Sequence, residues 1–382
     1  MAGLPRPTGP HAVGRTARDW TDPDRADPYA RRPAARRLAV WIWYPAIPTP
    51  APPAPYLPGL WKASALAMGI GGGVRPHAVR DTVPAQLPTP WPVVVFSPSG
   101  NPPLVYAALL EELASHGYVV AGISHTYESM PMSVFADGRA RLMRPTSLGG
   151  AFAAPGARPF DTDLRERASV VSVKAADIRF VVEALRRDPP RLLRGRLDTD
   201  RVAAVGHSFG GGAAAEVCRH GPAVRAGVSL DGGLWRAPGE AGVETPFLQL
   251  FGEHPEYTLL CAEVVRQGLM ADAAYCAADR ACSVGAWQAL HDSARPGLTA
   301  KVAGAKHAGF FDTPMLPLRR WSPLARLRGD PGPAAWRATA DVLLAFLDRH
   351  LRGGDGAVLD RLADDPRYVV APPAELFSAT AR

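Results

Sequence analysis

The sequence lacks any hydrophobic run that is long enough to cross a membrane. Its apolar stretches stay well short of the roughly 18 consecutive apolar residues that a spanning helix needs. The first ten residues, MAGLPRPTGP, also lack the apolar core of a secretory signal peptide. We therefore expect a cytoplasmic address, with export left open as the alternative.

Cysteine is scarce, at four residues in 382, and the spacing of the cysteines fits no zinc pattern. Cys218 follows a run of small residues and is expected to be buried. Cys261, Cys276 and Cys282 lie close together in the sequence and are either reduced thiols or the source of one disulfide. The Glu253-His254 pair does not make a metal site by itself, so we expect neither a metal nor a cofactor.

The chain has no basic stripe with interleaved aromatic residues, although its net charge is +7. The basic residues are mostly arginine and are spread among acids, which argues against a nucleic-acid partner. It also has no Ser/Gly-rich linker, no charge run dividing the middle and no internal repeat. We expect a single domain over 1–382, with an N-terminal arm and edge strands in 1–75, and oligomeric state is left open.

Strand-like runs alternate with helical patterns, which predicts a mainly parallel sheet covered by helices on both faces. Expected strands are 38–45, 92–97, 118–124, the run ending at 207, 224–231, 246–253 and 298–307, and expected helices are 104–117, 166–187, 209–220, 259–270, 284–293 and 333–351. The segments 128–163 and 254–295 read as a long irregular stretch and a cap-like insertion, respectively.

Between the strand that ends at His207 and the helix that follows stands the motif Gly206-His207-Ser208-Phe209-Gly210. Gly-x-Ser-x-Gly alone is weak, but a serine at a strand-to-helix turn flanked by glycines is typical of a nucleophile elbow. The glycines let the backbone bend sharply, so that the serine hydroxyl emerges at the carboxyl end of the strand. Ser208 is therefore the candidate nucleophile.

A serine hydroxyl needs a base and an acid that orients the base. His125 and His307 are the candidate bases at the carboxyl ends of expected strands, and His307 ends the last one, which gives the order Ser, acid, His of an α/β-hydrolase. Asp231 and Glu253 both end strands and are possible acids; we favour Asp231, because the run before it is continuously apolar.

Backbone donors must stabilise the oxyanion that forms on the substrate. The N–H of Phe209, at the start of the helix after the nucleophile, is the expected first donor. The second donor should come from the loop after the strand 92–97, and because Pro98 and Pro102 have no N–H it is Ser99, Gly100 or Asn101.

At this point the residues resemble the platelet-activating factor acetylhydrolases of the plasma and intracellular type II group, with their bacterial relatives. The resemblance is carried by LPRPTGP at 4–10, WYP at 43–45, PVVVFS at 92–97, LASHGYVVA at 113–121, GHSFGG at 206–211 and SLDG at 229–232. It implies a calcium-independent serine hydrolase of carboxylic esters with Ser208, Asp231 and His307 as its triad. It also implies Gly100 as the second oxyanion donor, although Pro98-Ser99 departs from the family's His-Gly loop.

Four large apolar residues, Trp61, Trp235, Phe310 and Phe311, are candidates for an acyl pocket or for ordinary core. The stretch 55–72 is a candidate for weak contact with a lipid interface, or packs over the protein's own cleft. The predicted function is hydrolysis of short or medium acyl esters through an acyl-enzyme. The alternatives are an acyltransferase or thioesterase with the same triad, and a catalytically silent lipid-binding module.

Overall fold

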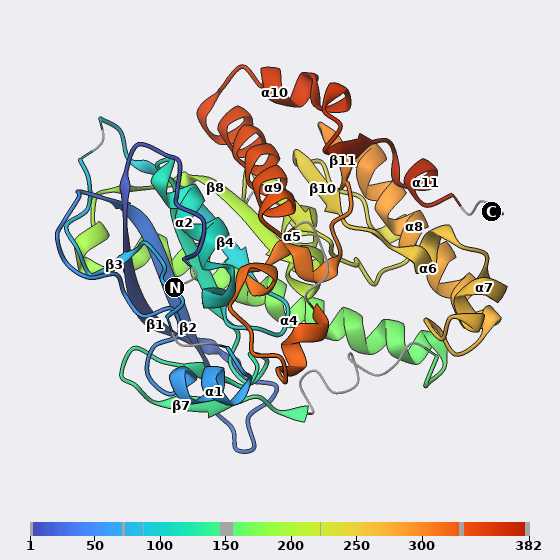
Figure 1. The fold of residues 1–382 in the computed structure, drawn as a ribbon, viewed down its shortest axis with the longest axis horizontal. Coiled ribbons are helices and arrows are strands. Elements are labelled where there is room, and N and C mark those ends of the chain that lie inside the picture. The colour runs from blue at the N-terminus through green and yellow to red at the C-terminus, as the bar shows by residue number, and fades with distance from the viewer. Residues whose placement is uncertain are drawn as a thin grey trace.

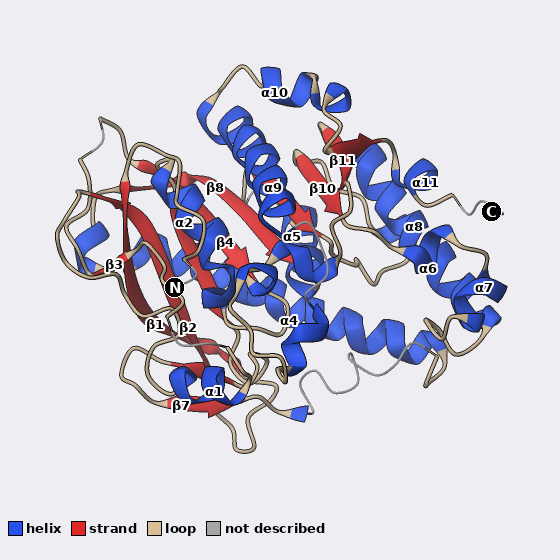
Figure 2. Cartoon of the chain, viewed as in Figure 1, coloured by secondary structure: helices blue, strands red, loops and turns tan. Residues whose placement is uncertain are grey.

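The computed structural model of the chain describes residues 3–70, 73–86, 88–145, 156–221, 223–327 and 332–378. Its centre is a ten-stranded sheet with the order β12-β11-β10-β9-β8-β4-β5-β2-β1-β3 (Figures 1 and 2). The strands of this sheet are β1 (Ala12–Ala26), β2 (Ala35–Ala46), β3 (Val79–Arg80), β4 (Trp91–Ser97), β5 (Val119–Ser124), β8 (Leu197–His207), β9 (Ala226–Leu230), β10 (Phe247–Phe251), β11 (Gly297–Val302) and β12 (Tyr368–Val370).

The middle of the sheet, from β5 through β4, β8, β9 and β10 to β11, is parallel. Its strands are apolar on both sides because both faces are covered. Along β4, Val94 and Phe96 belong to one hydrophobic cluster, while Val93 and Val95 belong to another. The expected mainly parallel sheet is confirmed.

Helices cover the two faces of the sheet in separate layers (Figures 1 and 2). The helices are α1 (Trp61–Ala67), α2 (Ala107–Ser115), α4 (Phe160–Arg187), α5 (Phe209–Arg219), α6 (Pro255–Thr258), α7 (Cys261–Arg266), α8 (Ala273–Ser293), α9 (Gly332–Leu347), α10 (Ala357–Asp360) and α11 (Pro373–Leu376). Buried residues of α2 and α9 share one cluster with the sheet, and buried residues of α4, α5 and α8 share the other.

Several parts of the structure differ from the sequence-based expectation. The strands β1, β3 and β12 were not predicted; they lie at or near the two edges of the sheet, where polar residues are tolerated. The segment 128–163 contains a hairpin of β6 (Met132–Val134) and β7 (Ala140–Leu142) and the start of α4, while 146–155 lie outside the described residues.

The segment 254–295, expected to be a cap-like insertion, holds α6, α7 and α8. α8 connects the parallel strands β10 and β11 and packs on the sheet, where Gln249 on β10 donates to the carbonyl oxygen of Trp287 at 3.0 Å. A parallel pair requires such a crossover, so α8 is part of the core fold. Among the described helices of this connection, α6 and α7 are additional to the crossover helix α8. A disulfide between Cys261 and Cys276 joins α7 to α8.

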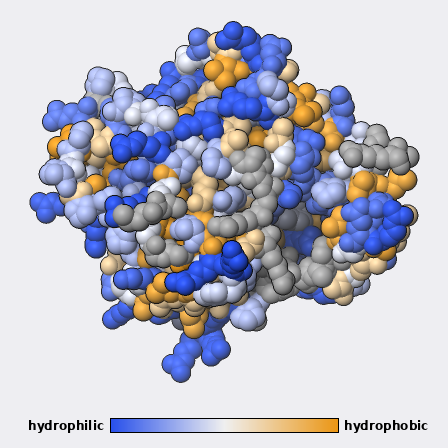
Figure 3. Space-filling view, in the orientation of Figure 1, coloured by the Kyte–Doolittle hydropathy of each residue, from blue (hydrophilic) through white to orange (hydrophobic). Residues whose placement is uncertain are grey.

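The apolar character of the helices and of the surface is relevant to contact with a membrane. Among the described helices none combines the length and the apolar character that crossing a bilayer requires. On the face shown in Figure 3, hydrophilic residues are spread between smaller hydrophobic areas. Of the remaining cysteines, Cys218 is buried, as expected, and Cys282 is partly buried.

Candidate active site

The turn between β8 and α5 holds Ser208 in a strained conformation. Its φ is 57° and its ψ is −120°, which residues with a side chain rarely adopt. Close packing makes glycine necessary on both sides. A Cβ on Gly206 would lie 2.0 Å from the carbonyl oxygen of Gly210, and a Cβ on Gly210 would lie 1.7 Å from that of Ser97. The structure therefore presents Ser208 at the carboxyl end of β8, as a nucleophile elbow does.

Asp231 and His307 meet beside this elbow. Asp231 follows β9, and the N–H of Ser208 donates to the carbonyl oxygen of Leu230, directly before it, at 2.9 Å. His307 follows β11, and its Nδ1 lies 2.6 Å from Oδ2 of Asp231. The Asp231 side chain is fully buried, whereas that of His307 is half exposed. Ser208 itself is buried, and among the described residues its hydroxyl has no hydrogen-bonded side-chain partner.

The second carboxylate oxygen of Asp231 is also fully engaged. Oδ1 accepts a hydrogen bond from the N–H of Gly252 at 2.7 Å and lies 2.8 Å from Nε2 of His254. Burial alone would raise the pKa of Asp231, but the charge and hydrogen bond of His254 and the contact with His307 hold it well below its usual range. Burial likewise opposes protonation of His254, yet Asp231 and Glu256 raise the pKa of His254 to about 10. Asp231 therefore stays an anion between two imidazoles.

His254 was not singled out from the sequence as part of the site. The His254 side chain is only 14% exposed. Glu253, the alternative acid, behaves as expected of a surface group: it pairs with Lys301 at 3.0 Å and is 41% exposed. The signal available in the sequence was the position of His254, three residues after a strand at the catalytic edge.

His207, next to the nucleophile, connects other parts of the site. Its Nδ1 accepts a hydrogen bond from the Tyr106 hydroxyl at 2.8 Å, and its Nε2 lies 3.1 Å from the carbonyl oxygen of His307. Burial lowers the pKa of His207 to about 3, and His307 acts in the same direction. A neutral ring with its proton on Nε2 fits both contacts, so His207 holds the catalytic-histidine loop against the elbow.

Three other histidines have partners elsewhere in the fold. His125 is completely buried and contacts Ser97 and Asp177. On α8, His291 lies 2.9 Å from the Thr299 hydroxyl, and the His350 ring packs on Phe346. None of these four contacts involves Ser208 itself.

The loop after β4 lies against the elbow, because Ser97 touches Gly210 and pairs with Gly206 in the sheet. Of the three candidate donors, Ser99 uses its backbone N–H in a hydrogen bond to the Tyr106 hydroxyl. In the described part of the chain, the N–H groups of Gly100 and Asn101 have no acceptor. Gly100 is buried beside the elbow, so it remains the better candidate of the two.

Three of the four pocket candidates lie near the triad. Trp235 stacks on Phe209 with ring centroids 4.3 Å apart, Phe310 stacks on His207 at 5.8 Å, and Phe311 lies 5.7 Å from His207. Val170 and Val171 on α4 and Met143 join Phe209 and Trp235 in one apolar cluster, which the sequence analysis did not find.

Trp61 is placed in the core instead of in a pocket. Its side chain is 1% exposed, its indole N–H donates to the carbonyl oxygen of Met132 at 2.9 Å, and its ring packs on Trp41. All of these contacts are with the N-terminal strands and the β6–β7 hairpin. Trp61 therefore stabilises that part of the fold, and the expectation of a substrate contact is not supported.

Comparison with known proteins gives relatives that are named as acetylhydrolases or esterases. A family model described as platelet-activating factor acetylhydrolase, isoform II, matches residues 60–145, which include the loop with Gly100. A probable 1-alkyl-2-acetylglycerophosphocholine esterase of Arthroderma benhamiae is 29% identical over 147 residues, 38% of this chain and 32% of that protein. A platelet-activating factor acetylhydrolase of Bos taurus is 24% identical over 290 residues, 68% of this chain and 57% of that protein. The matched part thus spans between a third and somewhat over half of these relatives.

A solved structure matches over nearly the whole chain. The ferulic acid esterase from Streptomyces cinnamoneus superposes with a TM-score of 0.72 at 28% identity, over 96% of this chain and 98% of that one. The sheet, the elbow and this likeness define the class of the protein, an α/β-hydrolase. Within that class the chain is similar to the platelet-activating factor acetylhydrolase family, whose model matches residues 60–145.

Proposed function

We propose that the chain is a serine hydrolase of carboxylic esters. The observation that carries this proposal is the 2.6 Å contact between His307 Nδ1 and Asp231 Oδ2, beside a serine held in a strained turn. Nδ1 is engaged by the buried carboxylate, so Nε2 of His307 is the nitrogen that acts as base. The names of the relatives support an ester substrate.

In the proposed reaction Ser208 Oγ attacks the ester carbonyl carbon while His307 accepts the hydroxyl proton. The resulting oxyanion is stabilised by the N–H groups of Phe209 and Gly100. His307 then gives the proton to the leaving alcohol, which leaves an acyl group on Ser208. Water, activated by His307, hydrolyses this acyl-enzyme and releases the carboxylic acid.

We place the substrate among the short or medium acyl esters, because the described apolar groups beside Ser208 form a small cluster. Val170, Val171 and Phe209 are buried there, while Trp235 keeps part of its ring accessible. The stacked Phe209–Trp235 pair favours, as a second candidate, an ester with a flat aromatic acyl group. The ferulic acid esterase likeness supports this second candidate.

The experiment is a panel of p-nitrophenyl esters of increasing acyl length, together with an acetylated phospholipid and a feruloyl ester. We expect turnover that is highest for short and medium acyl groups and absent in Ser208→Ala. Adding an alcohol or a thiol acceptor separates hydrolysis from acyl transfer, since a transferase forms the new ester in preference to the free acid. No turnover of any ester by the parent protein, with Ser208 unreactive, would leave the lipid-binding alternative.

Two further features remain proposals. Weak contact with a lipid interface is supported by the exposed residues Leu60, Leu66 and Met68 on and beside α1. Residues 71–72 of the segment 55–72 lie outside the described residues.

The cellular location is the second proposal. The sequence predicts the cytoplasm, whereas the Cys261–Cys276 disulfide favours an oxidising compartment. Alkylation of free thiols after rapid acid quenching of cells tells whether the disulfide is formed where the protein resides.

A further inference from the structure

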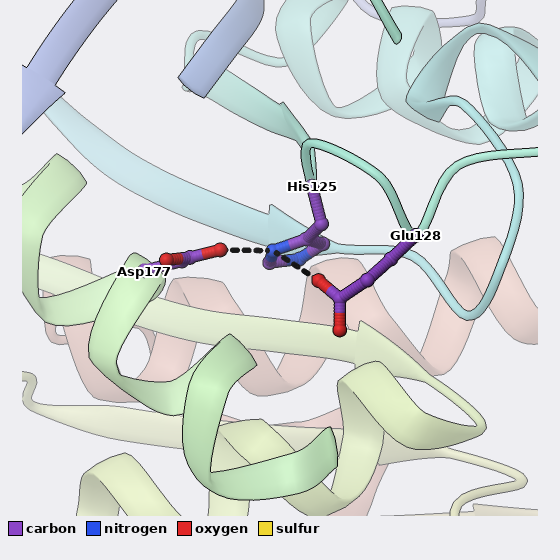
Figure 4. A group of neighbouring side chains, drawn as sticks. All are labelled: His125, Glu128 and Asp177. Carbon is purple, nitrogen blue, oxygen red and sulfur yellow. Dashed lines mark hydrogen bonds and ion pairs between the residues drawn. The ribbon is translucent and has the colours of Figure 1, made fainter. Parts of the chain in front are cut away.

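A cluster of buried charged side chains lies behind the loop that carries Gly100. It consists of Arg36, His125, Glu128, Lys174 and Asp177, and these side chains are at most 1% exposed. Figure 4 shows His125 between Asp177 and Glu128, at the end of β5. Ionised groups in such a position are costly unless they are paired, so the cluster requires an explanation.

A metal site is not that explanation. Ligand atoms of His125, Glu128 and Asp177 lie within 4.8 Å of one another. However, Arg36 already pairs with Glu128 at 3.1 Å and with Asp177 at 2.7 Å, and the Lys174 ammonium lies 4.0 Å from Glu128. Arg25 also pairs with Asp177 at 2.6 Å, and Asp27 pairs with Arg36 at 3.2 Å. Three cations thus balance three carboxylates, and a divalent cation would face the repulsion of those cations.

Two members of the cluster reach the oxyanion loop directly. His125 Nε2 lies 2.9 Å from the hydroxyl of Ser97, the last residue of β4. The Lys174 ammonium donates a hydrogen bond to the carbonyl oxygen of Ser99 at 2.8 Å. Burial lowers the pKa of Lys174, while Glu128 and Asp177 oppose this shift. The cluster therefore contacts this segment at two points, at Ser97 through His125 and at Ser99 through Lys174.

The contact with Ser99 matters because of what lies on the other side of the same peptide group. The carbonyl of Ser99 and the N–H of Gly100 share one planar unit, so fixing the carbonyl also fixes the direction of the N–H. A charged donor on the carbonyl oxygen polarises the unit and strengthens its N–H as a donor. The next carbonyl, that of Gly100, accepts from the N–H of Met130 at 2.7 Å, so both peptides around Gly100 are held.

We propose that Lys174 is a positioning residue that orients and polarises the Ser99–Gly100 peptide, so that the N–H of Gly100 faces the oxyanion. This inference rests on the proposed function, in which Gly100 is an oxyanion donor. A buried ion pair often adds little net stability compared with apolar packing. Holding a catalytic peptide gives the charge of Lys174 a function that an apolar residue could not fulfil.

The test uses three variants of the full chain. Lys174→Met removes the ammonium at similar side-chain length, and Glu128→Gln/Lys174→Met removes the charges of both partners, so that no carboxylate is left without its cation. The matched control is Glu128→Gln, which alters the same cluster but keeps the hydrogen bond from Lys174 to Ser99. Each is compared with the parent in thermal unfolding, in kcat and KM for one p-nitrophenyl ester, and in inhibition by a trifluoromethyl ketone, whose adduct with Ser208 carries an oxyanion.

We expect both variants without Lys174 to lose kcat by on the order of tenfold to a hundredfold, somewhat less than the loss of a whole oxyanion donor. Their KM should change little, and the inhibition constant of the ketone should rise by the same factor as kcat falls. Glu128→Gln should keep kcat and inhibition close to the parent values. A residue that only stabilises the fold would move the unfolding temperature without this parallel change.

The proposal is overturned if the double variant folds and keeps the parent's kcat and inhibition constant. It is equally overturned if Glu128→Gln alone loses as much kcat as the double variant, or if the double variant does not fold, because the cluster then acts structurally. Turnover by the parent and its loss in Ser208→Ala are measured in the same assay. Failure of the proposed function would appear there, and is thus distinguished from failure of the inference about Lys174.

Discussion

His254 Nε2 lies 2.8 Å from Oδ1 of Asp231, while His307 Nδ1 lies 2.6 Å from Oδ2 of the same carboxylate. One buried acid thus serves two imidazoles, of which only His307 is half exposed. The positive charge on His254 lowers the electrostatic support that Asp231 offers to a positive charge on His307. The structure thereby links a residue outside the triad to the pH dependence of the reaction.

We predict that His254→Gln moves the acid limb of the pH profile of kcat/KM to higher pH. Removing the neighbouring cation lets Asp231 stabilise protonated His307 more strongly, so the base becomes available only at higher pH. The measurement is kcat/KM for one ester across the pH range in which parent and variant stay folded. An unchanged or oppositely shifted limb would contradict this coupling.

The same pair predicts how stability depends on pH. The pKa of His254 is raised from 6.5 to about 10 in the folded chain, so its stabilisation is fully present below the unfolded value and is lost as pH rises through the folded value. The stability difference between the parent and His254→Gln should therefore be largest below pH 6.5 and disappear above about pH 10. Denaturant unfolding at several pH values measures it, and a difference that grows with pH would exclude the assigned charge state.

The identity of the triad acid is tested by comparing Asp231→Asn with Glu253→Gln. The amide of an asparagine would place N–H groups against the donors of Gly252, His254 or His307, and turnover should fall on the order of a thousandfold or more. Glu253 pairs with Lys301 at the surface, so its variant should lose about tenfold or less. The reverse ranking on one ester would assign the acid to Glu253.

The disulfide should affect stability and leave the chemistry alone. Cys261 and Cys276 are 15 residues apart and join α7 to α8, away from the Ser208 elbow. A loop of that length predicts a loss of about 3 kcal/mol of unfolding free energy in Cys261→Ser/Cys276→Ser, with kcat retained. Cys282→Ser is the control, because Cys282 is a free thiol. Equal unfolding temperatures for the parent and the double variant would show that the crosslink contributes nothing.

Chelation of metal ions should leave activity intact. The His125, Glu128 and Asp177 group is already balanced by Arg36 and Lys174, and the proposed steps use only Ser208, Asp231, His307 and backbone N–H groups. Ester turnover after exhaustive dialysis against EDTA is the measurement. Loss of turnover that calcium or zinc restores would point to a metal-dependent mechanism.

Most of the sheet was predictable because its signals are local. The parallel strands are continuous apolar runs, and glycines beside Ser208 mark a turn that no larger residue can adopt. β1 escaped prediction because its second half, DWTDPDRA, contains the polar and proline residues of a turn, which an edge strand tolerates. The place of the crossover helix α8 in the core could not be predicted, because the sequence of a crossover does not state on which face of the sheet it packs.

The missed residues of the site depend on contacts between distant segments. Lys174 and Asp177 lie on the buried side of α4, although a charge normally indicates the solvent side of a helix. Partners from other parts of the chain, among them Arg36 and Glu128, make their burial possible. His254 likewise acquires its role from Asp231, 23 residues earlier. Such pairings cannot be read from spacing along a single element.

The central claim is that Ser208 becomes acylated, and intact-protein mass spectrometry during turnover tests it most directly. After mixing with a p-nitrophenyl ester and quenching in acid within the first turnovers, the parent chain should carry one added acyl group, located on Ser208 by peptide mapping. Ser208→Ala should carry none and should lose turnover by on the order of a millionfold, as happens when a catalytic serine is removed. Full ester turnover by Ser208→Ala, or an acyl group mapped to a different residue, would contradict the account.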